Sequence, residues 1–222
     1  MKYMTIKDMV KGSVKWFLPF CLVAFLPLLA SCGEDDDSAS GEFDNWQERN
    51  ETYWNNLYQT ARSNADGIWK ILRTWSKDAT AELKNTDYVI VHVEEQGSGT
   101  VSPLYTDSVR MHYVGHLMPS ASYPQGYQFD KSYTGSYDFA TMKPAEGIVK
   151  GFVDGFTTAL LSMHVGDLWK VYIPYTLGYG TSDRSGIPGY STLVFDLKLV
   201  SFYRPGAVIP EWNAKRQTFF DN

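Results

Sequence analysis

The chain has 222 residues, of which 44% are hydrophobic and 15% aromatic, and its 20 basic and 25 acidic residues give a net charge of −5. An acidic protein of this kind is a poor nucleic-acid binder, so we expect no nucleic-acid partner. It contains only two cysteines.

The N-terminal segment has the composition of an export signal. Lysines at positions 2, 7, 11 and 15 precede the apolar run 16–30. A run of about 15 residues is short for spanning a bilayer but typical of a signal-peptide core. It ends as Leu29-Ala30-Ser31-Cys32, which resembles the lipobox at which bacteria cleave before a cysteine and acylate it. We predict a lipoprotein signal peptide at 1–31 and lipidation of Cys32; a signal peptide with a chance cysteine is the alternative.

Lipidation of Cys32 would leave no free cysteine, because Cys21 lies in the removed segment. Disulfides, a cysteine nucleophile and cysteine-based metal sites are then excluded from the mature protein. Removal of 1–31 takes away four lysines and one aspartate and leaves 16 basic and 24 acidic residues, a net charge of about −8. The bacterial lipoproteins that the signal resembles carry several acyl chains, which predicts stable attachment to a membrane through Cys32.

Residues 32–43 form an acidic linker, with Glu34 and Asp35–Asp37 close after the cysteine. Such a charge run is typical of a solvated tether. A similar cluster sends some lipoproteins to the outer face of the outer membrane, so a sorting signal is the alternative. We therefore expect an outer-membrane lipoprotein of the bacterial cell envelope, facing either the periplasm or the cell surface.

Residues 44–86 are predicted to be an N-terminal helical extension. Helical spacing predicts a helix over 44–63, with Asp44 placed to cap its start and an apolar stripe at Trp46, Asn50, Tyr53, Trp54, Leu57, Tyr58 and Ala61. This stripe either docks on the following domain or forms a dimer interface. The segment 68–75 fits a helix or a strand, and the pattern does not decide between them.

After Asn85 the hydrophobic period changes from helical to alternating. Strands are predicted at 88–94, 108–115, 168–173 and 193–199, and one short helix at about 153–163, with Phe152, Phe156, Leu160 and Met163 on its buried face. Strands on both sides of a single helix indicate an α+β domain of about 120 residues, an antiparallel sheet packed on that helix.

Six motifs in this region resemble the FKBP-type peptidyl-prolyl isomerases in order and spacing. They are VRMHYVG (109–115), QFDKSY (128–133), GIVKGFVDGF (147–156), MHVGDLWKVYIP (163–174), LGYG (177–180) and IPGYSTLVFDLKL (187–199). The resemblance covers residues 87–203, leaving 204–222 as a C-terminal tail. It implies an antiparallel half-barrel sheet wrapped on one short helix, with a shallow hydrophobic pocket for a prolyl ring.

The resemblance also implies the residues of this pocket: Tyr113, Phe129, Asp130, Ile148, Val149, Phe152, Tyr179, Ile187, Phe195 and, by ungapped counting, Phe139. A small shift in the counting would select Tyr137 instead of Phe139. By the same resemblance, the backbone N–H of Val149 and the hydroxyl of Tyr179 would bind the substrate carbonyl, and Asp130 would set the local field.

The implied activity is peptidyl-prolyl cis-trans isomerisation in exported proteins. Proline-containing peptides or proteins and macrolide ligands are the implied partners, and no metal or cofactor is needed. His112 and His116 point to the same side of a predicted strand with no third ligand in the sequence, so they do not indicate a metal site.

Three departures from the family pattern bear on activity. Phe152 stands where the family most often has a tryptophan that floors the pocket, which predicts weaker catalysis. Residues 116–128 exceed the usual connection by about six residues, either as a flap near the site or as a surface insertion without a role. Gly189 and Tyr190 replace the Pro and small polar residue common in the last loop. A non-catalytic FKBP-fold peptide-binding or chaperone module is therefore the alternative to an enzyme.

Overall fold

The structure, a computed structural model, describes residues 41–64, 66–138 and 141–213. The expected signal peptide 1–31, the lipidation site Cys32 and the acidic cluster after it lie outside the described residues, as do Phe139 and the last nine residues of the tail. Within the described ranges, no helix combines the length and apolar character required to cross a bilayer.

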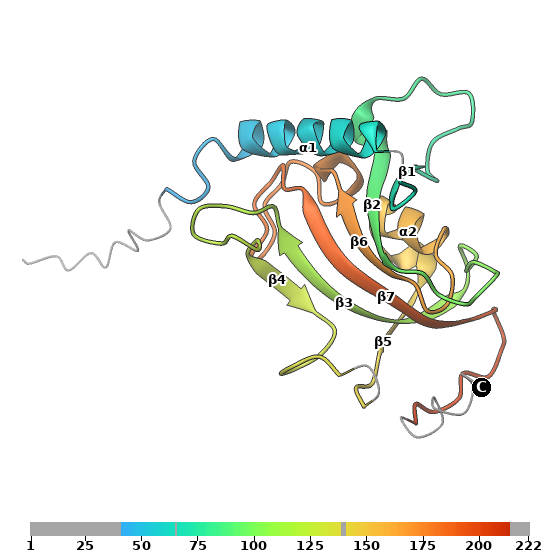
Figure 1. The fold of residues 1–222 in the computed structure, drawn as a ribbon. Helices are drawn as coiled ribbons and strands as arrows, with labels where there is room; N and C mark the ends of the chain where they lie inside the picture. The colour runs from blue at the N-terminus through green and yellow to red at the C-terminus, as the bar shows by residue number, and fades with distance from the viewer. Residues whose placement is uncertain (1–40, 65, 139–140, 214–222) are drawn as a thin grey trace, which may run out of the picture. The chain divides into compact units, whose positions relative to one another are not determined.

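One antiparallel sheet of seven strands organises the described chain (Figure 1). The strand order is β1-β2-β6-β7-β3-β4, and β5 pairs with β3. The alternating pattern correctly predicted β2, β3, β6 and β7, whereas β4 and β5, with four residues each, are too short to show a period. The strands are β1 Trp69–Arg73, β2 Tyr88–Glu95, β3 Ser108–Leu117, β4 Gln128–Lys131, β5 Ala145–Ile148, β6 Leu168–Ile173 and β7 Leu193–Tyr203.

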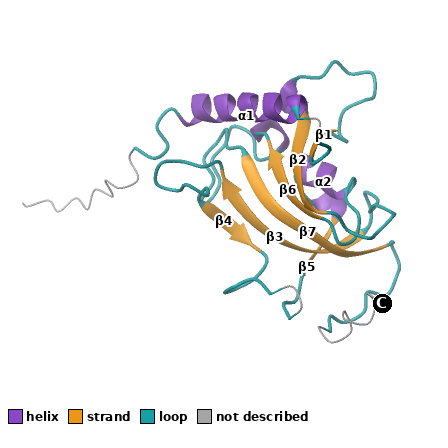
Figure 2. Cartoon of the chain, in the orientation of Figure 1, coloured by secondary structure: helices purple, strands orange, loops and turns teal. Residues whose placement is uncertain are grey.

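The sheet curves around helix α2, Asp154–Leu160 (Figure 2). Phe156, Leu160 and Met163 are buried against side chains of β2, β3, β6 and β7, which together form the main core. This arrangement confirms the predicted α+β half-barrel on one short helix. Three short 3-10 turns complete the described fold: η1 Asn85–Asp87, η2 Val149–Gly151 and η3 Tyr175–Leu177.

Strand β2 is covered on both faces, which its alternating pattern did not reveal. Val89 and Val91 belong to the core under α2, whereas Ile90, fully buried, packs on the opposite face with Trp54 and Ala61 of helix α1, Trp46–Ser63. The segment whose structure the sequence left open is strand β1, which extends this face because Ile71 pairs with Ile90. The N-terminal extension therefore adds one strand to the sheet and one helix across it.

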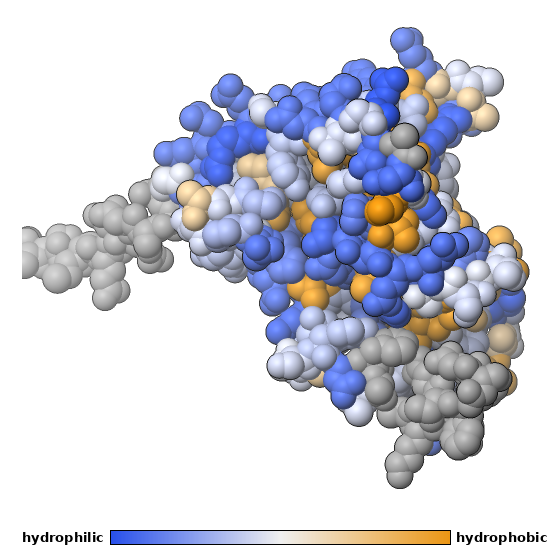
Figure 3. Space-filling view, viewed as in Figure 1, coloured by the Kyte–Doolittle hydropathy of each residue, from blue (hydrophilic) through white to orange (hydrophobic). Residues whose placement is uncertain are grey.

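Helix α1 docks on the loop before β7 through buried hydrogen bonds. The Trp46 indole Nε1–H donates to Ser191 Oγ at 2.8 Å, and the Thr192 backbone N–H donates to Asn50 Oδ1 at 2.7 Å. The outward side of α1 is mainly hydrophilic in Figure 3. The apolar stripe predicted for this helix is thus occupied by the following domain.

The expected cap of α1 by Asp44 is wrong. Asn45 occupies the N-cap position with a left-handed φ of 50°, and no side chain caps the first turn. The backbone carbonyl of Phe43 accepts the Trp46 N–H at 3.1 Å, and the Arg49 guanidinium binds the Glu42 carbonyl at 2.6 Å. The chain enters the helix through a tight turn that is fixed by backbone contacts.

We predict that Asn50→Ala lowers the free energy of unfolding by about 1–3 kcal/mol, because it leaves the buried N–H of Thr192 without its acceptor. Urea denaturation measures the change. The exposed Asn56 on the same helix offers a matched control: Asn56→Ala should change stability by less than about 0.7 kcal/mol, since alanine is the better helix former. Equal stability of both variants would contradict the docking of α1 through Asn50.

Candidate active site

A cluster of aromatic rings lies where α2 meets the sheet. The Phe156 ring packs against Phe195 of β7 with centroids 5.0 Å apart, against Phe152 at 4.9 Å and against Tyr113 of β3 at 6.2 Å. Phe129 of β4 meets Phe195 edge-on at 5.6 Å. Rings from five segments therefore converge into one apolar surface.

Two glycines let these rings approach the backbone. A Cβ at Gly115 would lie 2.6 Å from the Phe129 ring and 2.7 Å from that of Phe195, and a Cβ at Gly147 would lie 2.5 Å from the Phe152 ring. Real Cβ atoms do not tolerate such distances, so any larger residue would displace a ring. The shape of the aromatic surface therefore requires glycine at both positions.

One carboxylate and one phenol stand beside the rings. The Tyr113 hydroxyl donates to Asp130 Oδ2 at 2.9 Å, and the Lys131 backbone N–H donates to Asp130 Oδ1 at 2.7 Å. Burial, followed by the hydrogen bond to Asp130, raises the pKa of Tyr113 to about 12, and the charge of the nearby Tyr179 phenolate would act in the same direction. Tyr113 is therefore a neutral hydrogen-bond donor at physiological pH, and it fixes the orientation of Asp130.

The backbone N–H of Val149, expected to bind a substrate carbonyl, already has an acceptor. It donates to the Asp107 carbonyl at 2.9 Å, and Val149 is fully buried. The neighbouring Ile148 is 47% exposed and presents its side chain to solvent. A substrate carbonyl could use the Val149 amide only by sharing or displacing the bond to Asp107.

The loop between η3 and β7 leaves the Tyr179 side chain exposed and buries that of Ile187. The Gly180 N–H donates to the Tyr175 carbonyl at 2.8 Å, and Gly180 has a φ of +73°, a conformation that glycine adopts without strain. Tyr179 is 39% exposed, and its hydroxyl makes no hydrogen bond within the described residues, whereas Ile187 is 6% exposed and belongs to the core. Tyr179 is thus the accessible hydroxyl donor near Tyr113.

The tenth expected residue, Phe139, is outside the described residues, but its alternative can be placed. The Tyr137 ring lies edge-on to His112 at 5.3 Å. His112 alternates with Met111 and Tyr113 of β3 and so faces away from the aromatic cluster. Tyr137 therefore packs against His112, and it lines a smaller cavity of about 170 Å³ that also includes Tyr113.

The sequence pattern predicted only that Phe156 is a core residue, yet its ring contacts three residues that were expected in the pocket. The available signal was that Phe156 shares the buried face predicted for the helix with Phe152, although in the structure Phe152 lies before the first residue of α2. Phe156 forms the back of the candidate site.

The fold and the site define a class of protein in which a curved antiparallel sheet packs on one helix and carries an aromatic surface beside an oriented carboxylate. It can bind a small apolar ring, exclude water from one side of it and present a hydroxyl to an adjacent carbonyl.

Known proteins are similar to this chain in sequence and in fold. Residues 99–200 match the family described as FKBP-type peptidyl-prolyl cis-trans isomerase. The macrophage infectivity potentiator of Trypanosoma cruzi is 30% identical over 185 residues, which cover 83% of this chain and 82% of that protein. The FKBP-type 22 kDa peptidyl-prolyl cis-trans isomerase of Escherichia coli is 39% identical over 109 residues, covering 49% of this chain and 47% of its own length.

Solved structures agree with the fold. The crystal structure of FkpA from Escherichia coli has a TM-score of 0.51 and 24% identity, covering 72% of this chain and 62% of that one. A peptidyl-prolyl cis-trans isomerase from Pseudomonas syringae also gives a TM-score of 0.51, at 22% identity, covering 71% of this chain and 96% of its own. The chain belongs to the FKBP-type peptidyl-prolyl cis-trans isomerase family.

We predict that Tyr113→Phe removes one phenol with a pKa of about 12 from the ultraviolet titration of the folded protein. Because the folded-state pKa lies above the ordinary value of 10, the stabilisation from this group is complete below pH 10. It is lost as the pH rises from 10 towards 12. A missing phenol that titrates near pH 10 would contradict the burial and hydrogen bonding of Tyr113.

Proposed function

We propose that this isomerase takes the prolyl ring of exported client proteins into a cup formed by Tyr113, Phe129, Phe152 and Phe195, with Phe156 behind it. The observation that carries the proposal is the convergence of these rings, with centroid separations of 4.9–6.2 Å, beside the Tyr113–Asp130 hydrogen bond. Ile148 and Ile187 would complete the apolar lining.

The chemistry follows from the X-Pro bond itself. Its rotation is opposed by a barrier of about 20 kcal/mol and takes tens to hundreds of seconds, because resonance gives the C–N bond partial double-bond character and places partial negative charge on the carbonyl oxygen. Aromatic walls that exclude water disfavour this charge-separated ground state, and a donor that meets the twisted carbonyl favours the transition state. The proposed donor is the Tyr179 hydroxyl, and Asp130 supplies the local field.

A client-holding module without turnover is the second candidate, and two observations favour it. Phe152 gives a smaller floor than the tryptophan usual in the family, and the Val149 amide is already bonded to Asp107. Both features reduce stabilisation of the transition state while they leave the apolar cup intact. Macrolide ligands would bind the same cup in either case and would compete with peptide.

We predict that micromolar protein accelerates cis-trans isomerisation of a short X-Pro peptide in a protease-coupled assay. Tyr179→Phe should lower kcat/KM about threefold to tenfold, because it removes one neutral hydrogen bond to the carbonyl. Tyr175→Phe removes a hydroxyl from η3, just before that loop, where its ring packs on Tyr190, and should keep the wild-type rate. Wild-type rates equal to the uncatalysed rate would favour the holding module, and an unaffected Tyr179→Phe would remove the role of that hydroxyl.

We also propose that the protein is exported and anchored to the outer membrane of a bacterial envelope through lipidated Cys32. The support is the sequence of 1–32: a lysine-rich start, an apolar run and a lipobox-like end. The polar tether that follows would hold the isomerase near newly exported chains. Its acidic cluster would decide between the periplasmic side and the cell surface, which protease shaving of intact cells distinguishes.

We predict that Cys32→Ser abolishes labelling by a fatty-acid analogue in cells and moves the protein from the membrane fraction to the soluble fraction. Cys21→Ser is the matched control, since this cysteine lies in the segment to be removed, and it should change neither result. Retention of the label in Cys32→Ser would contradict the lipidation site.

A further inference from the structure

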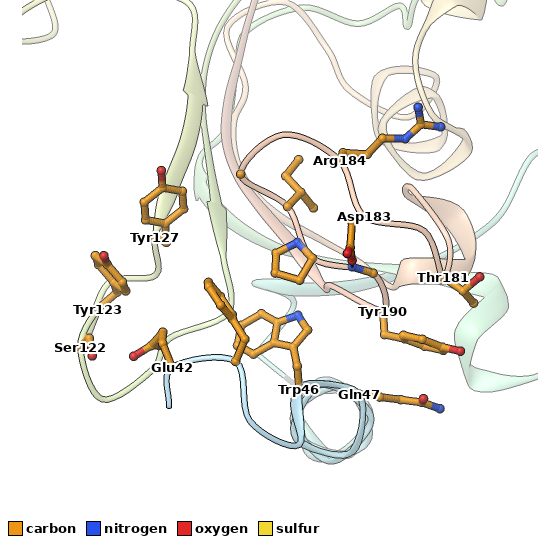
Figure 4. A pocket seen from close by; sticks show the side chains of 15 residues that line it. Glu42, Trp46, Gln47, Ser122, Tyr123, Tyr127, Thr181, Asp183, Arg184 and Tyr190 are labelled. Atoms are coloured by element: carbon orange, nitrogen blue, oxygen red, sulfur yellow. The ribbon is translucent and has the colours of Figure 1, made fainter. Parts of the chain in front are cut away.

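A groove of about 980 Å³ lies beside the aromatic cup (Figure 4). In the figure, Tyr123 and Tyr127 stand on one side of it, Thr181 and Tyr190 stand on the other, and Trp46 rises from α1. Three segments far apart in sequence therefore build one cavity. Its lining consists of Glu42, Phe43, Trp46 and Gln47, then Ser122, Tyr123 and Tyr127, and finally Thr181, Asp183, Arg184 and 186–190.

Hydrogen bonds and ring contacts fix the walls of the groove. Trp46 is 7% exposed and held by Ser191, and the Phe43 ring meets it edge-on at 5.1 Å. In the wall that contains Tyr123 and Tyr127, the Leu117 N–H donates to the Tyr127 carbonyl at 2.9 Å, and the two tyrosine rings lie edge-on at 5.2 Å. The insertion 116–128 is thus an ordered wall, and a ligand would lose little free energy in ordering it.

The groove is continuous with the proposed prolyl cup. Ile187 lines the groove and also belongs to the core beneath the cup. At Gly186, a Cβ would lie 3.6 Å from the Tyr127 ring and 4.0 Å from Phe129 Cβ, so this glycine sits between a groove residue and a cup residue. An extended peptide advances about 3.3 Å per residue. A client whose proline occupies the cup would therefore enter the groove within a few residues.

The exposed chemistry of the groove indicates what kind of segment fits. Phe43, Tyr123 and Tyr127 are 37%, 41% and 37% exposed, so their ring faces are in contact with water. Aromatic rings of this kind gain free energy when apolar side chains cover them. Two carboxylates, Glu42 and Asp183, outnumber the single Arg184, which disfavours anionic ligands.

We propose that this groove binds the client segment next to the proline, an extended stretch with apolar side chains and no net negative charge. The inference rests on the proposed isomerase function, since it assigns a substrate subsite to the same site. The volume is near the upper end of the range of about 300–1,000 Å³ for small-molecule pockets, which gives room for several side chains.

The test compares two peptides with the same X-Pro core, one of four residues and one of ten residues with leucine and phenylalanine in the extensions. For the wild type, kcat/KM should be at least about tenfold higher for the long peptide. Phe43→Ala and Tyr123→Ala, which alter two different segments of the lining, should each reduce this long-to-short ratio about threefold to tenfold. Ile68→Ala, 41% exposed at the β1 edge of the sheet, should leave the ratio unchanged.

A second readout keeps the groove testable without turnover. Fluorescence anisotropy of the labelled ten-residue peptide should give a Kd that rises about threefold to tenfold in Phe43→Ala and Tyr123→Ala, with circular dichroism confirming that both variants fold. If no peptide is isomerised yet these Kd shifts appear, the isomerase function fails and the groove stands. An unchanged ratio together with an unchanged Kd overturns the groove. Loss of self-association in these variants, with unchanged peptide binding, would also overturn it by assigning the surface to a second copy.

Discussion

The Phe156 ring joins helix α2 to the sheet, and the candidate site depends on that contact. This ring is 4% exposed, and it packs against both Phe152 and Phe195 at about 5 Å. The core therefore continues without a break into the floor of the cup. Because a packed ring cannot shift without opening a void, the shape of the cup is set by the same contacts that stabilise the fold.

Glycine complements this contact from the side of the sheet. At Gly115 the rings of Phe129 and Phe195 occupy the space that a side chain would need. A cup whose shape is fixed in this way would need little rearrangement to accept the proposed prolyl ring, which would leave binding free energy to orient the carbonyl.

Trp46, the first residue of helix α1, has a comparable double role. Its indole anchors α1 to Ser191, and its ring forms part of the groove wall. Docking of the N-terminal helix and formation of the groove are therefore one event. The N-terminal extension therefore contributes to the groove wall as well as to the packing of the fold.

Sequence periodicity predicted those features that depend on long regular patterns. Alternation located the four longer strands, and the resemblance to the FKBP-type isomerases implied Tyr113, Asp130 and Tyr179, which the structure brings together. It could not predict that Ile90 packs under α1, because a single aliphatic residue on the same face as Tyr88 and His92 does not indicate a covering helix. The groove could not be predicted from the sequence either, because its residues come from three segments that only the tertiary fold brings together.

The hydrogen bond of the Val149 amide could not be predicted from the sequence either, because its acceptor is the backbone carbonyl of Asp107 and not a particular type of side chain. This occupancy and the groove have a common consequence for how the protein uses its binding energy. Contacts remote from the rotating bond are equal in ground and transition states, so they tighten binding without lowering the barrier from the bound complex. If the proposed site binds clients, a smaller floor at Phe152, an amide already bonded to Asp107 and a large adjoining groove would favour retention of extended clients over rapid turnover of short ones.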